Sequence, residues 1–406
     1  MTDLINTDTN VNGVYPSQWI IEAMQTGIIS CSSGITPKQV QPNSLDVRLD
    51  NTAYRVNCSF LPRHEGMTKK LSEFKWYDIL IKDSGTVLER NQVYLFPLQE
   101  CLALPDHIAA SANPKSTTGR LDVFTRLVTD NGQAFDEIPA GYHGRLFLEV
   151  VPRSFAIIVR PGDTLAQIRF YTGQSKLTDL ETQTLIDNEV LIVDEDYTFP
   201  GTFSTLRSNE LRVQGGIHLT VRLNGKMVNG KEREEVIGYR AKKNQRPIDL
   251  RLIGKSVTRN YWENIFSDSR HVILEPDEFY IFASKELVRL PPAYCAEMVP
   301  FDASSGELRT HYAGFFDSGF GYEPGPDPRA SAAAIVLEIR NRDVPFLIEA
   351  GQPLFRMILL RNIEEPSMLY GKTSGSNYQM QRLRLSKQFP PRKDDETVTT
   401  GQGELF

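Results

Sequence analysis

The first residues that could do chemistry form a short polar run, Pro114-Lys115-Ser116-Thr117-Thr118-Gly119-Arg120-Leu121. If Lys115 to Thr117 begin a helical turn, their backbone N–H groups and hydroxyls converge on an anion, as a phosphate site requires. Arg120 follows Ser116 by four residues, so it would lie on the same face of that turn. An ordinary polar turn with a capping hydroxyl would contain the same residues, and the spacing alone leaves both interpretations open.

A single carboxylate, Glu338, lies in the apolar, strand-like run from Ala334 to Ile339. Apolar surroundings raise the pKa of a carboxyl group, which suits it to take a proton from water and return it to a leaving group. A solvent-facing glutamate paired with Arg340 or Arg342 would give the same pattern. In the first half of the chain, Glu149 sits in the same frame, between Leu148 and Val150.

Two further segments carry groups suited to binding. Phe316 to Gly321 is an aromatic-flanked Asp-x-Gly turn, in which Asp317 could bind a sugar hydroxyl or a water, or could simply form an Asx-turn. The stretch from Tyr370 to Gln381 is polar and rich in glycine and serine, and it contains the aromatic Tyr378. This composition is typical of a flexible flap, but also of a mere tail.

Composition excludes several classes of protein. The formal net charge is −6, so there is no global basic field to hold nucleic acid, and a small anion would be bound by a few local cations. No Cys-x-x-Cys pair and no histidine at ligand spacing accompany the four cysteines, which argues against a zinc site or a disulfide framework. No apolar run approaches the roughly 18 residues that a membrane span needs. We expect a soluble, cytoplasmic protein with no membrane partner.

The elements that must position these groups are mostly strands. Ile20, Ile21, Met24 and Ile28 predict one amphipathic helix, beginning with Ser17 as N-cap and ending at about Ile28. Beyond it, short β-type runs are divided by Gly, Pro, Asn and Asp, and they include residues 44–49, 93–98, 144–151, 155–159 and 165–171. This spacing predicts an all-β barrel or sandwich.

An internal repeat divides the 406 residues into two halves. Segments recur at an offset of 186, as in Tyr94-Leu95-Phe96 and Tyr280-Ile281-Phe282, or of 189, as in Leu148-Glu149-Val150 and Leu337-Glu338-Ile339. We therefore predict an N-terminal domain over 1–180, a linker over 181–210, a C-terminal domain over 211–389 and a disordered tail over 390–406.

Taken together, from about Ser17 to Phe389, these segments resemble the dCTP deaminase branch of the dUTPase-like superfamily, particularly its long, duplicated bacterial form. Pro114 to Leu121 resembles the Arg-Ser-Ser-x-x-Arg motif of that family, with Lys115 and Thr117 in place of the first arginine and second serine. Phe316 to Gly321 resembles its Ile-Asp-Pro-Gly-Trp turn.

Two more motifs lie in the second half. Ile335 to Glu338 matches the Ile-Val-Leu-Glu strand that carries the catalytic glutamate of the family. Tyr370, Tyr378 and Gln381 match the spacing of its C-terminal segment, although Asn377 replaces a lysine there. That substitution puts a neutral side chain where the family has a charged phosphate contact.

The resemblance implies two tandem, mainly β domains of distorted-barrel or jelly-roll type with a short N-terminal helix. It implies hydrolysis of dCTP to dUTP and ammonia, in pyrimidine deoxynucleotide (dUMP and dTTP) synthesis, with Glu338 as general base and Ser116 and Arg120 as its catalytic partners. The substrate-binding residues that it implies are Lys115, Thr117, Asp317, Val336, Tyr370, Asn377, Tyr378 and Gln381. Mg²⁺ would be held through the triphosphate, without zinc or a protein-bound metal, and a homo-oligomer is expected.

The two halves lack complementary parts of this site. The run Asp302-Ala303-Ser304-Ser305-Gly306-Glu307 has lost both basic groups, while residues 135–144 lack the matching acid and no flap follows them. We therefore predict one composite site, within a chain or between chains. The alternatives are a dUTPase, a bifunctional dCTP deaminase and dUTP diphosphatase, and a non-catalytic nucleotide-binding protein.

Overall fold

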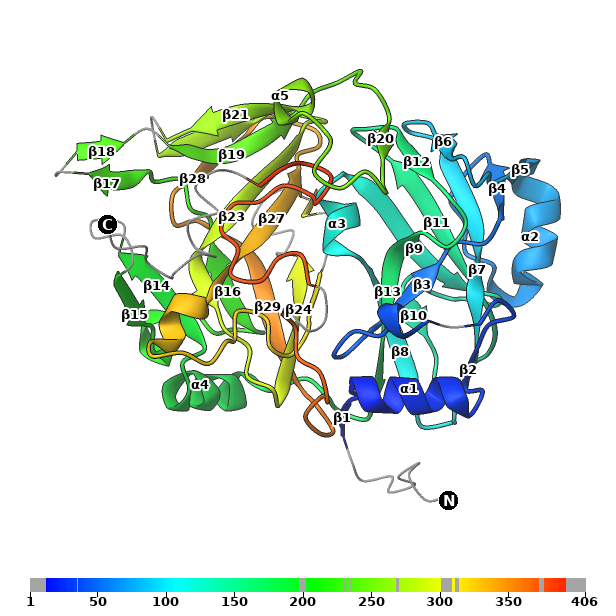
Figure 1. Ribbon diagram of the computed structural model, residues 1–406, viewed down its shortest axis with the longest axis horizontal. Helices are drawn as coiled ribbons and strands as arrows, with labels where there is room; N and C mark the ends of the chain where they lie inside the picture. Colours follow the sequence, from blue (N-terminus) through cyan, green and yellow to red (C-terminus); the bar gives the residue numbers. More distant parts are fainter. Residues whose placement is uncertain are drawn as a thin grey trace, which may run out of the picture.

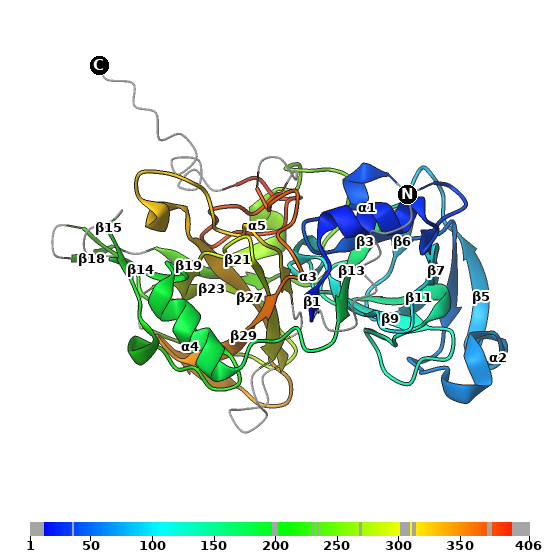
Figure 2. The ribbon, with the colours of Figure 1, turned by 90° about the horizontal axis from the view of Figure 1, so that it is seen from below.

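The computed structural model describes residues 12–34, 36–196, 202–228, 231–233, 235–267, 270–300, 309–310, 314–371 and 376–391. Its two halves lie side by side, and each is built on β-sheets (Figures 1 and 2). The predicted mainly β, two-domain fold is confirmed.

The strands of the first half are β1 Gly13–Val14, β2 Ile29–Ser30, β3 Leu45–Arg48, β4 Thr52–Val56, β5 Lys75–Leu80, β6 Thr86–Leu88, β7 Val93–Ala103, β8 Ala109–Pro114, β9 Val123–Thr129, β10 Glu137–Ile138, β11 His143–Pro152, β12 Ile157–Val159 and β13 Thr164–Thr172. One sheet has the order β1-β13-β8-β10, with β3 also on β13, and the other has the order β5-β4-β7-β11-β9, with β2 also on β7. Along β8 buried and half-buried residues alternate, so one face of the strand packs on the core while the other lies toward the protein surface.

The strands of the second half are β14 Ile192–Asp196, β15 Thr202–Thr205, β16 Ile217–Thr220, β17 Lys226–Val228, β18 Lys231–Arg233, β19 Val236–Ala241, β20 Ile248–Asp249, β21 Trp262–Phe266, β22 His271–Leu274, β23 Phe279–Val288, β24 Tyr294–Pro300, β25 Arg309–Thr310, β26 Phe315–Phe316, β27 Ala333–Arg340, β28 Phe346–Glu349 and β29 Pro353–Arg361. β27 pairs with β23 in the larger sheet, and every residue of β27 is buried. A strand buried on both faces is almost wholly apolar, so its two charged residues require partners.

The helices are α1 Ser17–Gln25, α2 Gly66–Phe74, α3 Ser116–Gly119, α4 Asp179–Asn188 and α5 Thr258–Tyr261. α1 ends three residues before the predicted boundary, since Gly27 adopts a positive φ of 81° and Ile29 already belongs to β2. The predicted N-cap was wrong, because Pro16 takes that position and Ser17 is the first helical residue. None of the helices in the described ranges is long and apolar enough to cross a membrane.

The sequence repeat has a counterpart in hydrogen bonding and register. The Tyr94 hydroxyl accepts from the backbone N–H of Glu89 at 3.0 Å, and the Tyr280 hydroxyl accepts from Glu275 at 2.9 Å. On the paired strands, Glu149 lies opposite Leu95 as Glu338 lies opposite Ile281. The two carboxylates therefore occupy equivalent strand positions.

The halves are joined by more than the covalent chain. β20, from the second half, pairs in parallel with β12 of the first half. Leu383, Leu385 and Phe389 belong to the same hydrophobic cluster as the core of the first half. The C-terminal segment, red in Figure 1, thus returns from the second half to the neighbourhood of α3.

The domain boundaries themselves stay a prediction. The segment expected to be a linker, 181–210, contains most of α4 together with β14 and β15, and β14 pairs with β23. Ile186 of α4, Ile192 of β14 and Leu191 just before that strand are buried in the core of the second half, so this segment is structured. Most of the predicted tail, 392–406, lies outside the described residues.

Candidate active site

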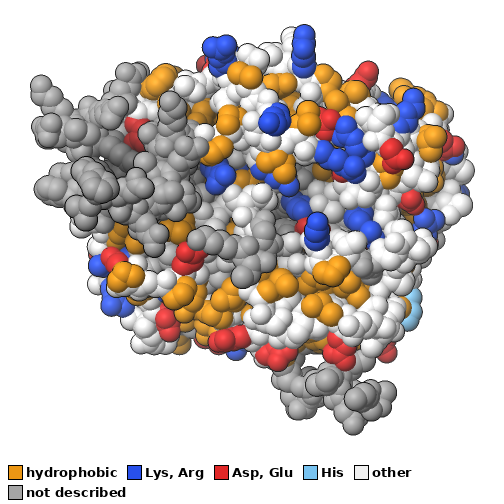
Figure 3. Space-filling model, in the orientation of Figure 1, with side chains coloured by type: hydrophobic (Ala, Val, Ile, Leu, Met, Phe, Trp, Pro, Cys, Tyr) orange, Lys and Arg blue, Asp and Glu red, His pale blue; other side chains and the backbone are white. Residues whose placement is uncertain are grey.

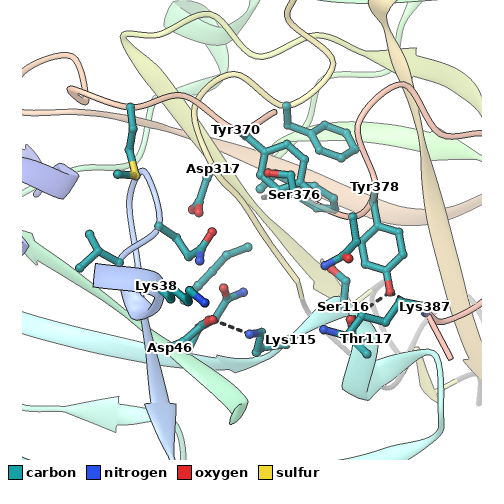
Figure 4. Close-up of a pocket in the computed structure, with 18 of the residues that line it drawn as sticks. Lys38, Asp46, Lys115, Ser116, Thr117, Asp317, Tyr370, Ser376, Tyr378 and Lys387 are labelled. Carbon is teal, nitrogen blue, oxygen red and sulfur yellow. Dashed lines mark hydrogen bonds and ion pairs between the residues drawn. The ribbon is translucent and has the colours of Figure 1, made fainter. Parts of the chain in front are cut away.

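A cavity of about 630 Å³ lies between the halves (Figure 4). The predicted site residues that line it are Lys115, Ser116, Thr117 and Arg120 from the first half and Asp317, Tyr370, Asn377, Tyr378 and Gln381 from the second. Both walls of the cavity come from one chain, so residues predicted for the composite site from both halves lie together within a single chain.

The run that begins the site adopts the expected turn. β8 ends at Pro114, Lys115 is extended and acts as N-cap, and the backbone N–H of Arg120 donates to the Ser116 carbonyl at 3.1 Å. The Thr118 hydroxyl fixes the turn to the sheet by donating to the Leu165 carbonyl at 2.8 Å. This places Ser116 and Thr117 at the cavity.

Gly119 allows β27 to approach this turn. A Cβ atom at position 119 would lie 2.2 Å from Oε2 of Glu338, far inside van der Waals contact. The close approach explains why a glycine stands here, since its φ is not in the left-handed region. The turn and the carboxylate are therefore packed directly against each other.

Arg120 is held by the second half of the chain. Its side chain is 3% exposed, Nη2 donates to Oε1 of Gln381 at 2.9 Å, and Nη1 donates to the carbonyl of Arg384 at 3.0 Å. The guanidinium lies over the Tyr378 ring at 3.8 Å from its centroid. The C-terminal segment is thus a part of the site and not a free tail.

Glu338 lies next to Arg120 and is not among the residues that line the cavity. Its side chain is 6% exposed, and Oε1 is 4.0 Å from Nε of Arg120, an atom with no hydrogen-bond partner among the described residues. Burial raises the pKa of Glu338 to about 8, Arg120 acts in the opposite direction, and the nearby Asp122 raises the pKa further. The solvent-facing alternative is excluded, because Glu338 is buried and Arg340 forms an ion pair with Asp122.

Asp317 is positioned by the first half. Nη2 of Arg169 donates to Oδ1 of Asp317 at 2.8 Å, and the Ser44 hydroxyl donates to Oδ2 at 3.3 Å. The backbone N–H of Ser318 donates to Oδ1 of Asn43 at 2.8 Å. These three residues of the first half were missed in the sequence, because each acts on a turn more than 140 residues away.

Several lysines line the cavity in addition to Asp317. Lys115 forms an ion pair with Asp46 and donates to the Thr164 hydroxyl at 2.9 Å. Burial raises the pKa of Asp46, and Lys115 opposes that shift. Lys38 and Lys387 also line the cavity, and the sequence motifs did not identify either of them.

Val336 and Glu338 are not among the residues that line the cavity, and both belong to β27. The Val336 side chain is buried in the hydrophobic cluster of the first half. A substrate contact from Val336 would therefore involve its backbone. Residues 372–375 of the flap and the run Asp302 to Glu307, including Ser304, lie outside the described residues.

Glu149, the counterpart of Glu338, faces its own domain. It is 3% exposed, burial raises its pKa, and Ser59 and Arg126 oppose that shift. On the adjoining surface Met67 of α2 packs with Phe147. The face of β11 that corresponds to the Glu338 face of β27 is thus covered from within the first half.

The fold and the site define a two-domain, mainly β enzyme, with a carboxylate and a guanidinium buried beside a cation-lined cavity. Family models of the N-terminal and C-terminal domains of 2'-deoxycytidine 5'-triphosphate deaminase match residues 11–174 and 201–389. The crystal structure of 2'-deoxycytidine 5'-triphosphate deaminase from Agrobacterium tumefaciens is 41% identical, with a TM-score of 0.77 over 87% of this chain and 99% of that one. The chain belongs to the dCTP deaminase family, whose members are hydrolases.

Shorter curated relatives match about a third of the chain. The dUMP-forming dCTP deaminase of Corynebacterium jeikeium is 29% identical over 139 residues, which are 34% of this chain and 70% of that protein. The dUMP-forming enzyme of Methanoregula boonei is 30% identical over 147 residues, covering 34% and 71%.

Proposed function

We propose that this chain hydrolyses dCTP to dUTP and ammonia at one composite site formed within the chain. The observation that carries the proposal is the buried Glu338 of one half next to the buried Arg120 of the other, at the edge of a cation-lined cavity. A general base works best when its pKa lies near the pH of the reaction. The pKa of Glu338, about 8, lies near neutral pH.

The reaction needs one water and one proton carrier. A water that hydrogen-bonds to both Glu338 and Nε of Arg120 would attack C4 of the cytosine while Glu338 takes its proton. The new C–O bond forms, the C4–N bond breaks, and Glu338 returns the proton toward the ring nitrogen and the departing ammonia. Ser116 and Arg120 would orient the amino group and the water, and dCTP plus water balances dUTP plus ammonia.

The remaining cavity residues would hold the nucleotide. Asp317, fixed by Arg169, would accept a hydrogen bond from the deoxyribose 3′-hydroxyl. The proposed triphosphate contacts come from residues that line one cavity, namely Lys115, Thr117, Tyr370, Asn377, Tyr378 and Gln381.

Mg²⁺ would bind at this site together with the triphosphate of the nucleotide. The two carboxylates that line the cavity, Asp46 and Asp317, are each paired with a cation, so we propose that the phosphate oxygens of the nucleotide supply the main ligands of the metal. When bound, Mg²⁺ would neutralise part of the phosphate charge. We propose that the chemistry itself needs no zinc.

The test is incubation of the purified protein with dCTP and Mg²⁺, with chromatographic separation of dCTP, dUTP and dUMP. Formation of dUTP with equimolar ammonia is the expected result. Binding of dCTP without any uracil nucleotide would instead identify a non-catalytic nucleotide-binding protein.

A bifunctional enzyme that releases dUMP is the second candidate, because the relatives from C. jeikeium and M. boonei are named dUMP-forming. The stretch Gly371 to Gln379 contains no arginine of the kind strict dUTPases carry, which favours deamination alone. Supplying dUTP as the only substrate separates the two, since only the bifunctional enzyme would produce dUMP from it. A cytoplasmic location and a homo-oligomer stay predictions.

A further inference from the structure

Lys387 is held at the cavity by a fixed stretch of backbone. Its neighbours Ser386 and Gln388 are buried, and they donate to the carbonyls of Thr117 and Leu250, each at 2.8 Å. The backbone N–H of Lys387 donates to the Tyr378 hydroxyl at 3.2 Å. With both neighbours directed into the protein, the Lys387 side chain is directed into the cavity (Figure 4).

Lys387 adds to an excess of positive charge at this place. The charged residues that line the cavity are the cations Lys38, Lys115, Arg120 and Lys387 and the acids Asp46 and Asp317. Both acids already have cationic partners, whereas in the described ranges no carboxylate lies within ion-pair distance of Lys387. Lysine and arginine side chains gather near the middle of the face seen in Figure 3, although the chain as a whole has a net charge of −6.

Lys115 and Lys387 lie close enough to repel each other. Burial and the charge of Lys115 lower the pKa of Lys387, while Asp46 and Asp163 act in the opposite direction. Lys115, Thr117 and Lys387 also line a second cavity of about 290 Å³, so the two lysines lie where the two cavities meet. Two neighbouring cations are stabilised when an anion binds to both of them.

We propose that Lys387 contacts the phosphate chain of the nucleotide together with Lys115, at the junction of the two cavities. Lys387 is the cation that the C-terminal segment contributes to the cavity lining, where the flap residue Asn377 is neutral. The proposal rests on the proposed function, because it takes the ligand to be a nucleoside triphosphate. It makes Lys387 a binding residue that discriminates between substrates by their number of phosphates.

The test compares K387M and K387R with the wild type on dCTP and dCMP. K387M should lower kcat/KM for dCTP about ten- to a hundred-fold, mainly through KM, because one charge-assisted hydrogen bond is lost. The change for dCMP should be several times smaller, and K387R should stay within a few-fold of the wild type. K69M, at an exposed lysine of α2, is the matched control and should change nothing.

A direct measurement of binding separates this proposal from the proposed function. Inorganic tripolyphosphate should bind the wild type in calorimetry and should bind K387M at least ten-fold more weakly. Should the wild type bind tripolyphosphate through Lys387 but not deaminate dCTP, the proposed function fails and the phosphate site stands. Equal losses on dCTP and dCMP, or unchanged tripolyphosphate binding in K387M, would overturn the site. If K387M does not fold, K387Q is subject to the same criteria.

Discussion

Replacing Glu338 by glutamine should abolish turnover and, at the same time, stabilise the protein. The amide keeps the shape of the side chain but cannot accept a proton, so kcat should fall by about 10²- to 10⁴-fold while dCTP still binds. The stabilisation follows from burial, because a carboxyl group with a folded-state pKa of about 8 resists the ionisation that the unfolded chain allows above its ordinary value of 4.5.

The magnitude follows from the two pKa values. Between them the folded state binds more protons than the unfolded state, so the wild type loses stability as the pH rises, by about 1.4 kcal/mol per pH unit. Relative to a side chain that does not ionise, the free energy of unfolding is lowered by about 1 kcal/mol at pH 5 and about 3 kcal/mol at pH 7. The loss is complete above the folded-state pKa of about 8.

Urea unfolding of the wild type and Glu338→Gln at pH 5 and pH 7 measures this difference. We expect the advantage of the variant to grow by about 2 kcal/mol between the two pH values. Glu73→Gln, on the exposed face of α2, is the control and should show no such growth. A constant difference would mean that Glu338 ionises normally in the folded protein, and a variant that keeps more than about a tenth of kcat would remove Glu338 from the base role.

Four further results are expected. Arg120→Ala and Gln381→Ala should lower kcat/KM non-additively, because the two side chains are hydrogen-bonded at 2.9 Å across the domain interface. Ser304→Ala should change kcat/KM little. Strictly additive losses in the double variant would disprove a shared site. Gly119→Ala should displace the Glu338 carboxylate, with a loss of kcat at least as large as that of Glu338→Gln, and near-normal activity would show that the exact position of this carboxylate does not matter. Glu149→Gln should leave kcat within a few-fold of the wild type, since its surroundings belong to the first half alone, and a loss that matches Glu338→Gln would indicate a second site. Activity should survive exhaustive zinc chelation once Mg²⁺ is restored, and stoichiometric zinc that is lost together with activity would contradict this.

The sequence was most informative where chemistry and local structure coincide. The turn at Ser116 is set by the residues of the turn itself, and the strand that bears Glu338 is set by its own apolar run, so both could be predicted. The repeat predicted which strands of the two halves are equivalent. Glu149 and Glu338 occupy matching positions on those strands. The turn and the strand depend on residues that are near one another in the chain, and the repeat shows in the sequence itself.

Contacts between distant segments could not be predicted in this way. Arg169 and Ser44 act on Asp317 from 148 and 273 residues away, and neither belongs to a motif. Lys387 follows the flap motif and becomes significant only because Ser386 and Gln388 are anchored on the first half. Whether the composite site forms within or between chains depends on domain packing, which periodicity and motif spacing do not contain.

Residues of the candidate site also form the contact between the two halves. The segments that meet there are β27 and the residues that follow α3. β27 presents Glu338 and then Arg340, two residues apart on one face, to Arg120 and then Asp122 of the first half. Arg340 and Asp122 form a buried ion pair, and Ser154 donates to Oδ2 of Asp122 at 2.6 Å, so this pair is also hydrogen-bonded. A shift of β27 by two residues would place Arg340 against Arg120 in a buried, poorly screened environment. The pairing of Asp122 with Arg340 therefore favours the register in which Glu338 lies next to Arg120, so the contact between the two halves also brings together the two residues proposed for catalysis.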